Sequence, residues 1–436
     1  MPGQGDLAVR KPRMQVFGYT IVALLNDGRY QSMAKFYPFR ALRPVKGKAG
    51  NTACLPYDVL SYEQAKELAV NAESFIHVIK SEADLPEGTD LYSDTVYQTA
   101  SDNLAAMCKD GVLVEEEQPA YYIYREISPD HTQTGVVGTV SCREYEAGII
   151  KRHELTVAEK EDDRTRHILT CRAQTGLVFL TFDAGQEFRA LADEVTKEEP
   201  SEDFVQGDVR HQVWPVTDEA LVARLSACFD AVPALYIADG HHRAASSCRA
   251  ARQLNADDST EAGRFMAAAF PADDLSLLGY HRIVHDLNGL TEDELFAKIR
   301  ESFDIKESEF GAVPLRAHQI SMWINGKGYY LEPHEDTYDA DDSVSRLDVS
   351  ILQNQLLDPI LGIRDPRRDK RISFIGGMHA AKEIKELTAQ PGKIGFLLYP
   401  TSIHDLMSVA DDGRIMPPKS TWFEPKLLSG LFVHRI

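Results

Sequence analysis

Residues 234–254, ALYIADGHHRAASSCRAARQL, decide how the chain can be interpreted. The apolar run at the start of this stretch ends at Asp239 and Gly240, and helix-forming residues follow. The stretch therefore predicts a strand, a tight turn and a helix. The side chains of HHR at 241–243 then fall in the first helical turn, where unpaired backbone N–H groups and the helix dipole favour an anion. The pattern is typical of a turn that holds phosphate.

The polar residues of this turn could carry chemistry. Asp239 could orient a hydroxyl group or hold a cation, and we place it with His241 among the candidate catalytic residues. Gly240, His242 and Arg243 are candidate phosphate ligands, because arginine offers the planar fork that phosphate prefers. The alternative interpretation is that Asp239 caps the helix and that the histidines bond to nearby backbone.

A second cluster, KRHELTVAEKEDDRTRH at 151–167, alternates acidic and basic residues. Glu154 could act as a general base toward a substrate hydroxyl group. His153, Lys160 and Arg164 could meet the charge of a phosphate group. The alternative is an exposed, salt-bridged start of a helix.

Two proline-containing segments carry polar side chains that a substrate could contact. They are LPYDVLS at 55–61, with Tyr57 and Asp58, and MPPKSTWFEPKLLSG at 416–430, with Lys419, Ser420 and Thr421. Lysine and hydroxyl side chains suit a phosphate or a carboxylate. Turn chemistry would also explain the first segment, and an ordered tail packed on the first domain would also explain the second.

The length and charge of the chain limit its architecture and partners. Its 436 residues exceed the roughly 250–300 residues at which a single hydrophobic core stops growing, so we expect two domains. The 47 basic and 67 acidic residues give a net charge of −20. A field of that sign repels polyanions, so we expect no nucleic-acid partner. The basic cluster at 364–371 suits a small anion, unless it is a solvated loop.

Cysteine and histidine spacing gives no metal-binding motif. The six cysteines are scattered without a CxxC pair, which argues against a disulfide framework or a thiolate zinc site. His281 and His285 stand four residues apart, but without the intervening carboxylate of metalloproteases. We therefore assign no metal ligand. No apolar signal core and no run of about 18 apolar residues is present, so we expect a cytoplasmic protein with no membrane partner.

Apolar patterning favours a mixed α/β fold. Runs of aromatic and β-branched residues predict strands at 121–127, 135–145 and 177–183. Thr217 is the expected cap of an amphipathic helix that leads to the strand at Ala234, so strand and helix alternate here. The acidic tract at 191–204 predicts an exposed loop.

A second unit begins after His285. The segment at 287–303 predicts a capped amphipathic helix, and two strands at 318–325 and 327–333 are predicted around a Gly326–Lys327 turn. We divide the chain into a disordered lead, a phosphate-binding domain and a smaller α+β domain. Their expected bounds are 1–13, 14–286 and 287–436.

Eight segments, in this order, resemble the bacterial domain-of-unknown-function family 1015. They are LPYDVLS (55–61), PAYYIYRE (119–126), RHELT (152–156), KEDDR (160–164), YIADGHHR (236–243), LDVSILQNQLLDPILGI (347–363), FIGG (374–377) and MPPKSTWFEPKLLSGLF (416–432). The resemblance spans nearly the whole chain from about Arg40 onward. The name of that family states no activity.

The YIADGHHR turn also resembles the phosphate-binding turn of the ParB/sulfiredoxin fold, whose members include nucleotide-dependent free-serine kinases. The resemblance implies a ParB/sulfiredoxin-like phosphate-binding core of mixed α/β class, with a second, smaller α+β domain. It implies that Asp239 lies near the transferring phosphoryl group and that the HHR side chains bind phosphate. It also implies Mg²⁺ with ATP or ADP as cofactors. A glutamate is the base in those kinases, and Glu154 is the candidate here.

These observations favour an enzyme that moves a phosphoryl group between a nucleotide, or water, and a small hydroxylated metabolite such as L-serine. It would act as a serine kinase or as a phosphatase of O-phosphoserine. The alternative, from another class, is a non-catalytic module that binds a nucleotide or a partner and thereby switches assembly, with a homodimer as one assembly that fits.

Overall fold

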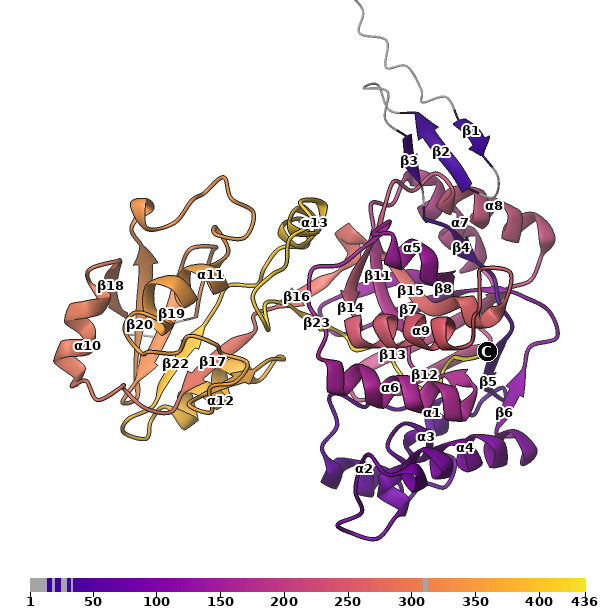
Figure 1. Ribbon diagram of the computed structural model, residues 1–436, viewed down its shortest axis with the longest axis horizontal. Helices are drawn as coiled ribbons and strands as arrows, with labels where there is room; N and C mark the ends of the chain where they lie inside the picture. The colour runs from indigo at the N-terminus through magenta and orange to yellow at the C-terminus, as the bar shows by residue number, and fades with distance from the viewer. Residues whose placement is uncertain (1–13, 18–19, 25–29, 33, 309–312) are drawn as a thin grey trace, which may run out of the picture.

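The computed structural model describes residues 14–17, 20–24, 30–32, 34–308 and 313–436. The disordered lead expected at 1–13 lies outside the described residues. Figure 1 shows a larger body around a nine-stranded sheet and a smaller body around a six-stranded sheet. The mixed α/β class and the second sheet domain expected from the sequence are confirmed.

A mixed sheet forms the centre of the larger body. In spatial order its strands are β12 (Glu202–Gln206), β13 (Val209–Val216), β7 (Tyr121–Ile127), β8 (Thr132–Ser141), β15 (Arg264–Pro271), β11 (Val178–Phe182), β14 (Leu235–Asp239) and β9 (Ile150–Lys151), with β4 (Phe36–Tyr37) paired to β8. The pairs β11–β15 and β14–β9 are parallel, and the other pairs are antiparallel. The strands predicted at 121–127 and 177–183 are confirmed as β7 and β11.

Strand β7 shows that both faces of this sheet are covered. Successive side chains of a strand point to opposite faces. Tyr121 and Ile123 belong to the core beneath the helices, whereas Tyr122 and Tyr124 belong to the core on the other face, where both rings contact Phe432. All four β7 side chains are fully buried. An apolar run without polar alternation is what such a doubly covered strand requires.

Helices cover one face of the sheet, and further elements close the larger body below it. The helices on the sheet are α5 (Cys142–Glu146), α7 (Gln186–Val195), α8 (Glu219–Phe229) and α9 (His241–Gln253). Helix α6 (Ala158–Cys171) packs against α9, and α4 (Asp94–Lys109) packs against α6. Beside them lie α1 (Ala49–Thr52), α2 (Tyr62–Leu68), α3 (Ile76–Ile79) and a four-stranded sheet of β10 (Ala173–Gln174), β24 (Val433–Arg435), β5 (Ala41–Pro44) and β6 (Leu113–Glu115). At the N-terminal end, β1 (Met14–Phe17), β2 (Thr20–Leu24) and β3 (Tyr30–Ser32) pair with one another.

Within the described residues, the smaller body is an antiparallel sheet with four helices. Its strands, in spatial order, are β18 (Phe303–Ser308), β20 (Lys327–Pro333), β19 (Ile320–Ile324), β22 (Ile394–Leu397), β17 (His281–Val284) and β21 (Ile372–Ile375). Its helices are α10 (Glu292–Ile299), α11 (Asp348–Leu352), α12 (Ala380–Leu387) and α13 (Ile403–Asp411). Single-turn segments lie at 335–337 and 353–357 in this part of the chain. Others lie at 81–84, 261–263 and 272–274, before β17.

The hairpin and the capped helix predicted in this body are confirmed, with one change. Thr291 and Glu294 form a reciprocal capping box at the start of α10. The tight turn between β19 and β20 is Asn325–Gly326 and not Gly326–Lys327. Both residues have positive φ, which a two-residue hairpin turn requires and which asparagine and glycine tolerate.

The C-terminal segment returns from the smaller body to the larger one. Strand β23 (Trp422–Glu424) pairs with β16 (Ser276–Leu278), and β24 then joins the four-stranded sheet. Figure 1 shows β16 and β23 side by side between the two bodies. The division at residue 287 stays a proposal. The strand pairing indicates that the chain enters the smaller body before β17 and returns to the larger body near residue 420.

Three local expectations were wrong. The acidic tract at 191–204 is not one loop, because Leu191 and Ala192 are buried in the second half of α7 and β12 begins at Glu202. The cap of α8 is Asp218, whose side chain accepts two backbone N–H bonds, and not Thr217. The strand expected at 135–145 ends at Ser141, because that side chain caps α5.

All six cysteines are free in the structure, and four of them are buried. In the described part of the chain, no helix combines the length and the apolar character needed to cross a membrane.

Candidate functional site

The turn between β14 and α9 has the predicted conformation. The strand ends at Asp239 and the helix begins at His241, with Gly240 between them in the left-handed region at φ 92°. Gly240 has no side chain with which to cap the helix, so the N–H groups of the first turn stay available to a ligand. Asp239 is therefore not the helix cap. Its Oδ1 accepts a hydrogen bond of 2.7 Å from the N–H group of Gly240.

Replacing Gly240 with alanine is expected to destabilise the protein by about 1–3 kcal/mol, because the left-handed backbone would be strained. The new Cβ would also lie 3.1 Å from Nε of Arg243, so that side chain would have to move. Gly111→Ala is the matched control, since its φ is 73° and nothing lies within 4 Å of the added Cβ. Urea unfolding should show a loss for both variants. Phosphate affinity should fall only for Gly240→Ala, and an equal affinity in both would contradict this placement.

The turn opens into a cavity of about 480 Å³. Every candidate site residue lines it except His153 and Arg164. Those that line it are Tyr57, Asp58, Glu154, Lys160, Asp239, Gly240, His241, His242, Arg243, Lys419, Ser420 and Thr421. Their roles stay predictions. Four segments that are distant in sequence therefore meet at one site, and its volume suits a small organic ligand.

The two exceptions lie behind the cavity wall. His153 is buried, and its ring meets the ring of His241 edge to face at 4.5 Å. Arg164 stacks on the ring of Tyr57 at 4.4 Å and forms an ion pair of 2.8 Å with Asp163. Its charge is thus already matched, so the structure does not place it where it could meet a phosphate group in the cavity.

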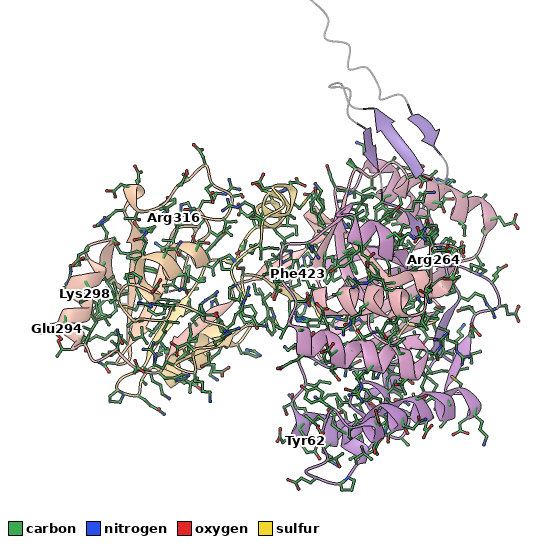
Figure 2. The ribbon with its side chains drawn as sticks, viewed as in Figure 1. Tyr62, Arg264, Glu294, Lys298, Arg316 and Phe423 are labelled. Atoms are coloured by element: carbon green, nitrogen blue, oxygen red, sulfur yellow. The ribbon has the colours of Figure 1, made fainter. Side chains whose placement is uncertain are left out.

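Several lining residues were not singled out from the sequence. They come from the smaller body and from the returning segment, and they include Tyr280, Phe374, Gly376, Glu383, Trp422, Phe423 and Lys426. Figure 2 places Phe423 where the two bodies meet. Gly376 belongs there for a steric reason, since a Cβ at this position would lie 2.2 Å from the Trp422 ring. Lys426 lies within the 416–430 segment whose other polar residues were predicted, so proximity in sequence was the available signal.

Asp239 is held by two cations. Its Oδ2 lies 3.2 Å from Nζ of Lys426 and 3.8 Å from a terminal nitrogen of Arg243. Burial alone would raise the pKa of Asp239, but Lys426 and Arg243 outweigh it and lower that pKa well below its usual range. The carboxylate therefore stays charged at neutral pH. It can accept a hydrogen bond from a hydroxyl group or hold a cation, as the sequence suggested.

Arg243 is the buried centre of this charge cluster. Its guanidinium donates to the carbonyl oxygen of Leu177 and lies 3.6 Å from Oδ2 of Asp58. The Nε atom is buried without a hydrogen-bond partner among the described residues. The carboxylates of Asp58 and Asp239 carry two negative charges against the one positive charge of Arg243, and Lys426 supplies a second positive charge.

The histidines of the turn are neutral. The Nε2 atom of His242 accepts a hydrogen bond of 3.0 Å from the N–H group of Val157. Burial, with help from Lys160, lowers the pKa of His242 to about 4. Burial lowers the pKa of His241 well below its usual value, and His153 lowers it further. His242 therefore bonds to the backbone, as in the alternative interpretation of the sequence. Neither imidazole carries a positive charge to a phosphate group at neutral pH.

Lys419 reaches the cavity from a strained backbone. Its φ of 60° is unusual for a residue other than glycine, and such strain is concentrated at functional sites. The ammonium group lies 5.4 Å from the centre of the Tyr280 ring. Burial would lower the pKa of Lys419, but Tyr280 and Glu154 outweigh it and raise that pKa. This lysine therefore brings a full positive charge to the cavity.

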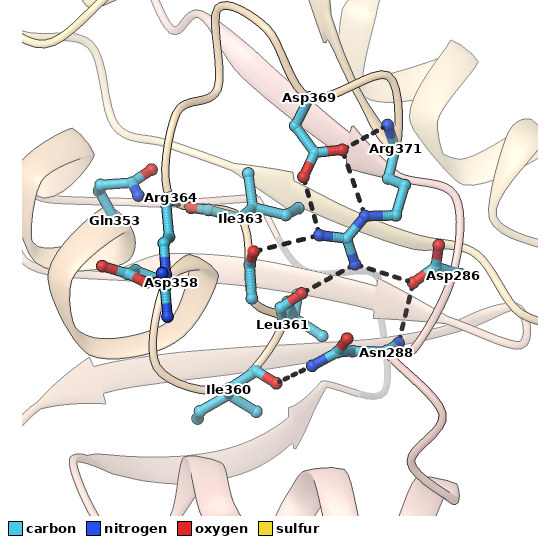
Figure 3. Close-up of polar contacts among 11 residues, drawn as sticks. Asp286, Asn288, Gln353, Asp358, Ile360, Leu361, Ile363, Arg364, Asp369 and Arg371 are labelled. Atoms are coloured by element: carbon cyan, nitrogen blue, oxygen red, sulfur yellow. Dashed lines mark hydrogen bonds and ion pairs between the residues drawn. The ribbon is translucent and has the colours of Figure 1, made fainter.

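The basic cluster at 364–371 is partly structural. Figure 3 shows Arg371 tying its loop together. The guanidinium donates to the carbonyl oxygens of Leu361 and Gly362 and bonds to Asp369 at 2.7 Å. Burial raises the pKa of Glu154, and the charges of Lys419 and of the exposed Arg367 partly oppose that rise. One residue of this cluster therefore acts on the cavity.

Buried histidines make stability depend on pH. Burial lowers the pKa of five histidines to about 4, namely His153, His167, His211, His242 and His281. The unfolded chain, with a histidine pKa of about 6.5, binds more protons than the folded chain between about pH 4 and 6.5. These groups therefore contribute stability that is lost as pH falls through this window. The free energy of unfolding is expected to decrease from pH 6.5 to 4.5 in urea titrations.

Buried carboxyl groups oppose this trend. Burial raises the pKa of Glu126 to about 8 and that of Glu144 to about 7, so the folded chain binds protons there that the unfolded chain has released. Glu126→Gln mimics the protonated carboxyl group and removes its opposing contribution. This variant should lose stability more steeply on acidification, by up to about 1.4 kcal/mol per pH unit. A shallower slope than that of the parent protein would show that the sign is wrong.

The fold is mixed α/β, and its strand–helix turn opens into a cavity lined by four basic and four acidic side chains. Residues 36–350 match the family model described as "Protein of unknown function (DUF1015)". The match covers well over half of the chain, so the protein belongs to this family, as the resemblance implied. The match ends before the FIGG segment at 374–377 and the segment at 416–432, so it is shorter than the extent expected from the sequence. A search of the curated proteins found no match.

Solved structures with some likeness share only 11–12% sequence identity with this chain. A conserved hypothetical protein from Pyrococcus furiosus has a TM-score of 0.34 at 12% identity, over 66% of this chain and 91% of its own. A free serine kinase variant in complex with AMP has a TM-score of 0.34 at 11% identity, over 65% and 86% of the two chains. SbnI with a C-terminal truncation, from Staphylococcus aureus, has a TM-score of 0.36 at 12% identity, over 67% and 85%.

Proposed function

We propose that this cavity binds a phosphorylated small molecule and that the protein transfers a phosphoryl group between a nucleotide, or water, and a hydroxylated metabolite such as L-serine. The observation that carries the proposal is the convergence of four cations, Lys160, Arg243, Lys419 and Lys426, on one helix N-terminus and one ionised aspartate. Phosphoryl transfer depends mostly on positioning and on neutralising charge. This cavity offers both.

The donors and rings of the cavity fit a nucleotide and a magnesium ion. The carboxylates of Asp58 and Asp239 supply the oxygen ligands that Mg²⁺ prefers, and the ion would neutralise phosphate charge beside them. The aromatic residues Tyr280, Phe374 and Trp422 line the cavity, and aromatic rings are the groups on which a nucleotide base stacks. A volume of about 480 Å³ is within the range of small-ligand sites.

Glu154 is the proposed base, and Asp239 positions the acceptor hydroxyl group. Burial raises the pKa of Glu154, with Lys419 opposing, and a base is most effective when its pKa lies nearer to neutral pH. With L-serine as acceptor, the substrate carboxylate needs a cation, and we assign this role to Lys419, which lines the cavity. The hydroxyl group of Ser420, by contrast, donates to the carbonyl oxygen of Pro417, so we assign it no substrate contact beyond lining the cavity.

Phosphorus NMR tests this proposal. The full-length protein is incubated with L-serine or O-phosphoserine, each with and without ATP, ADP and Mg²⁺. We expect either O-phosphoserine with loss of a nucleotide phosphate, or inorganic phosphate from O-phosphoserine. Shifted nucleotide resonances without turnover would favour the alternative of a nucleotide-binding regulatory module. The absence of both nucleotide binding and turnover would overturn the proposal.

A further inference from the structure

At the wall of the cavity lies a group of three side chains, of which the proposed reaction uses only the carboxylate of Glu154. A ring nitrogen of His153, a ring nitrogen of His241 and a carboxylate oxygen of Glu154 all lie within 4.8 Å of one another. The carboxylate lies 3.9 Å from Nδ1 of His241. Two imidazoles and one carboxylate form the donor set that divalent transition metals select.

Both histidines carry a buried nitrogen without a partner. The Nδ1 atom of His153 and the Nε2 atom of His241 make no hydrogen bond to any described residue. The residues are only 2% and 4% exposed, so open solvent does not satisfy these atoms. A buried polar atom without a partner costs roughly 1–3 kcal/mol and calls for an explanation, such as an ion that binds there.

From this geometry we propose that His153, His241 and Glu154 bind one divalent transition-metal ion, with Zn²⁺ as the best-matched probe. Three protein ligands leave a coordination position open toward the cavity, as in sites where a metal acts on a ligand. The side chains must close slightly, because zinc–nitrogen distances are about 2.0–2.1 Å. We infer this site from its donor atoms, and it does not depend on the proposed reaction. An ion bound here would hold the carboxylate of Glu154, so metal binding and proton acceptance exclude each other.

Zinc and cobalt binding to the full-length, chelator-treated protein tests the site. We expect one equivalent of Zn²⁺ per chain by calorimetry and elemental analysis, and visible d–d bands of low-symmetry Co²⁺ on titration with cobalt. Glu154→Gln and His241→Asn should each weaken Zn²⁺ binding at least tenfold. The Glu154 side chain is 36% exposed, so its glutamine variant is expected to fold even if a histidine variant does not.

His285→Asn is the matched control. His285 is bonded to Ser373 at 2.6 Å and stands near His281, the other histidine of the pair considered from the sequence. This variant should bind Zn²⁺ as the parent protein does. Unchanged affinity in Glu154→Gln, loss of binding only in His285→Asn, or no stoichiometric binding by the parent protein would overturn the site. These readouts need no turnover, so a negative phosphorus NMR result does not affect them.

Discussion

Replacing Asp239 with asparagine is expected to slow phosphoryl transfer at least about 100-fold, the scale on which positioned acid–base and electrostatic groups act. The asparagine oxygen can still accept the hydrogen bond from the N–H group of Gly240, so the turn keeps its shape. What is lost is the negative charge to which we assign, in the proposed function, the orientation of the acceptor hydroxyl group and the attraction of Mg²⁺. Steady-state kinetics with O-phosphoserine, or with ATP and L-serine, measure the change.

The effect of this substitution on stability is expected to be smaller than its effect on rate. Arg243 keeps Asp58 at 3.6 Å, and Lys426 keeps its contact with the ring of Trp422 at 4.4 Å, so neither cation is left without a favourable neighbour. Asp203→Asn is the matched control, because its partner is the surface residue Arg210 at 2.6 Å. That variant should keep the parent rate. Parent-like turnover by Asp239→Asn would rule out the role assigned to this carboxylate.

The local part of the site could be predicted from the sequence because it is encoded locally. A strand, a glycine at positive φ and a helix follow one another over 234–254, and this local order brings the polar residues of the turn to the helix N-terminus. Glu154 and Lys160 were found because charge alternates densely around them. Arg164 lies in the same charged segment, but its side chain contacts Asp163 and Tyr57. The position of a residue on a helix decides which way its side chain points, and composition alone does not show this.

Lys419, Ser420 and Thr421 were named from their own segment, but the way this segment reaches the turn could not be predicted, because it depends on long-range pairing. Lys426 bonds to Asp239 across 187 residues of sequence. That contact exists because β23 returns to pair with β16, and no local periodicity of Trp422–Glu424 indicates this partner. The mixed α/β class is easier to predict than this closure, since buried strands such as β7 carry their own apolar pattern.

Replacing Arg243 with methionine is expected to give the largest loss of stability of any cavity variant, about 3–5 kcal/mol, because it removes one partner of a buried charge cluster. Methionine keeps the length and flexibility of the side chain but not its charge. The carboxylates of Asp58 and Asp239 then lose their shared cation, and the carbonyl group of Leu177 loses its donor. Urea unfolding measures this loss, and titration with inorganic phosphate followed by phosphorus NMR should show at least tenfold weaker binding.

Two comparisons separate the charge effect from a packing effect. Adding Asp58→Asn to Arg243→Met removes one of the orphaned carboxylates, so the double variant should lose less stability than the sum of the single variants. Arg164→Met removes another arginine with low exposure, paired with Asp163 outside the cavity, and should destabilise the protein without weakening phosphate binding. Additive losses in the double variant, or equal phosphate affinity in Arg243→Met and Arg164→Met, would show that Arg243 acts through packing alone. Coupling to Asp58 together with selective loss of phosphate affinity would place the positive charge of Arg243 at the centre of the site.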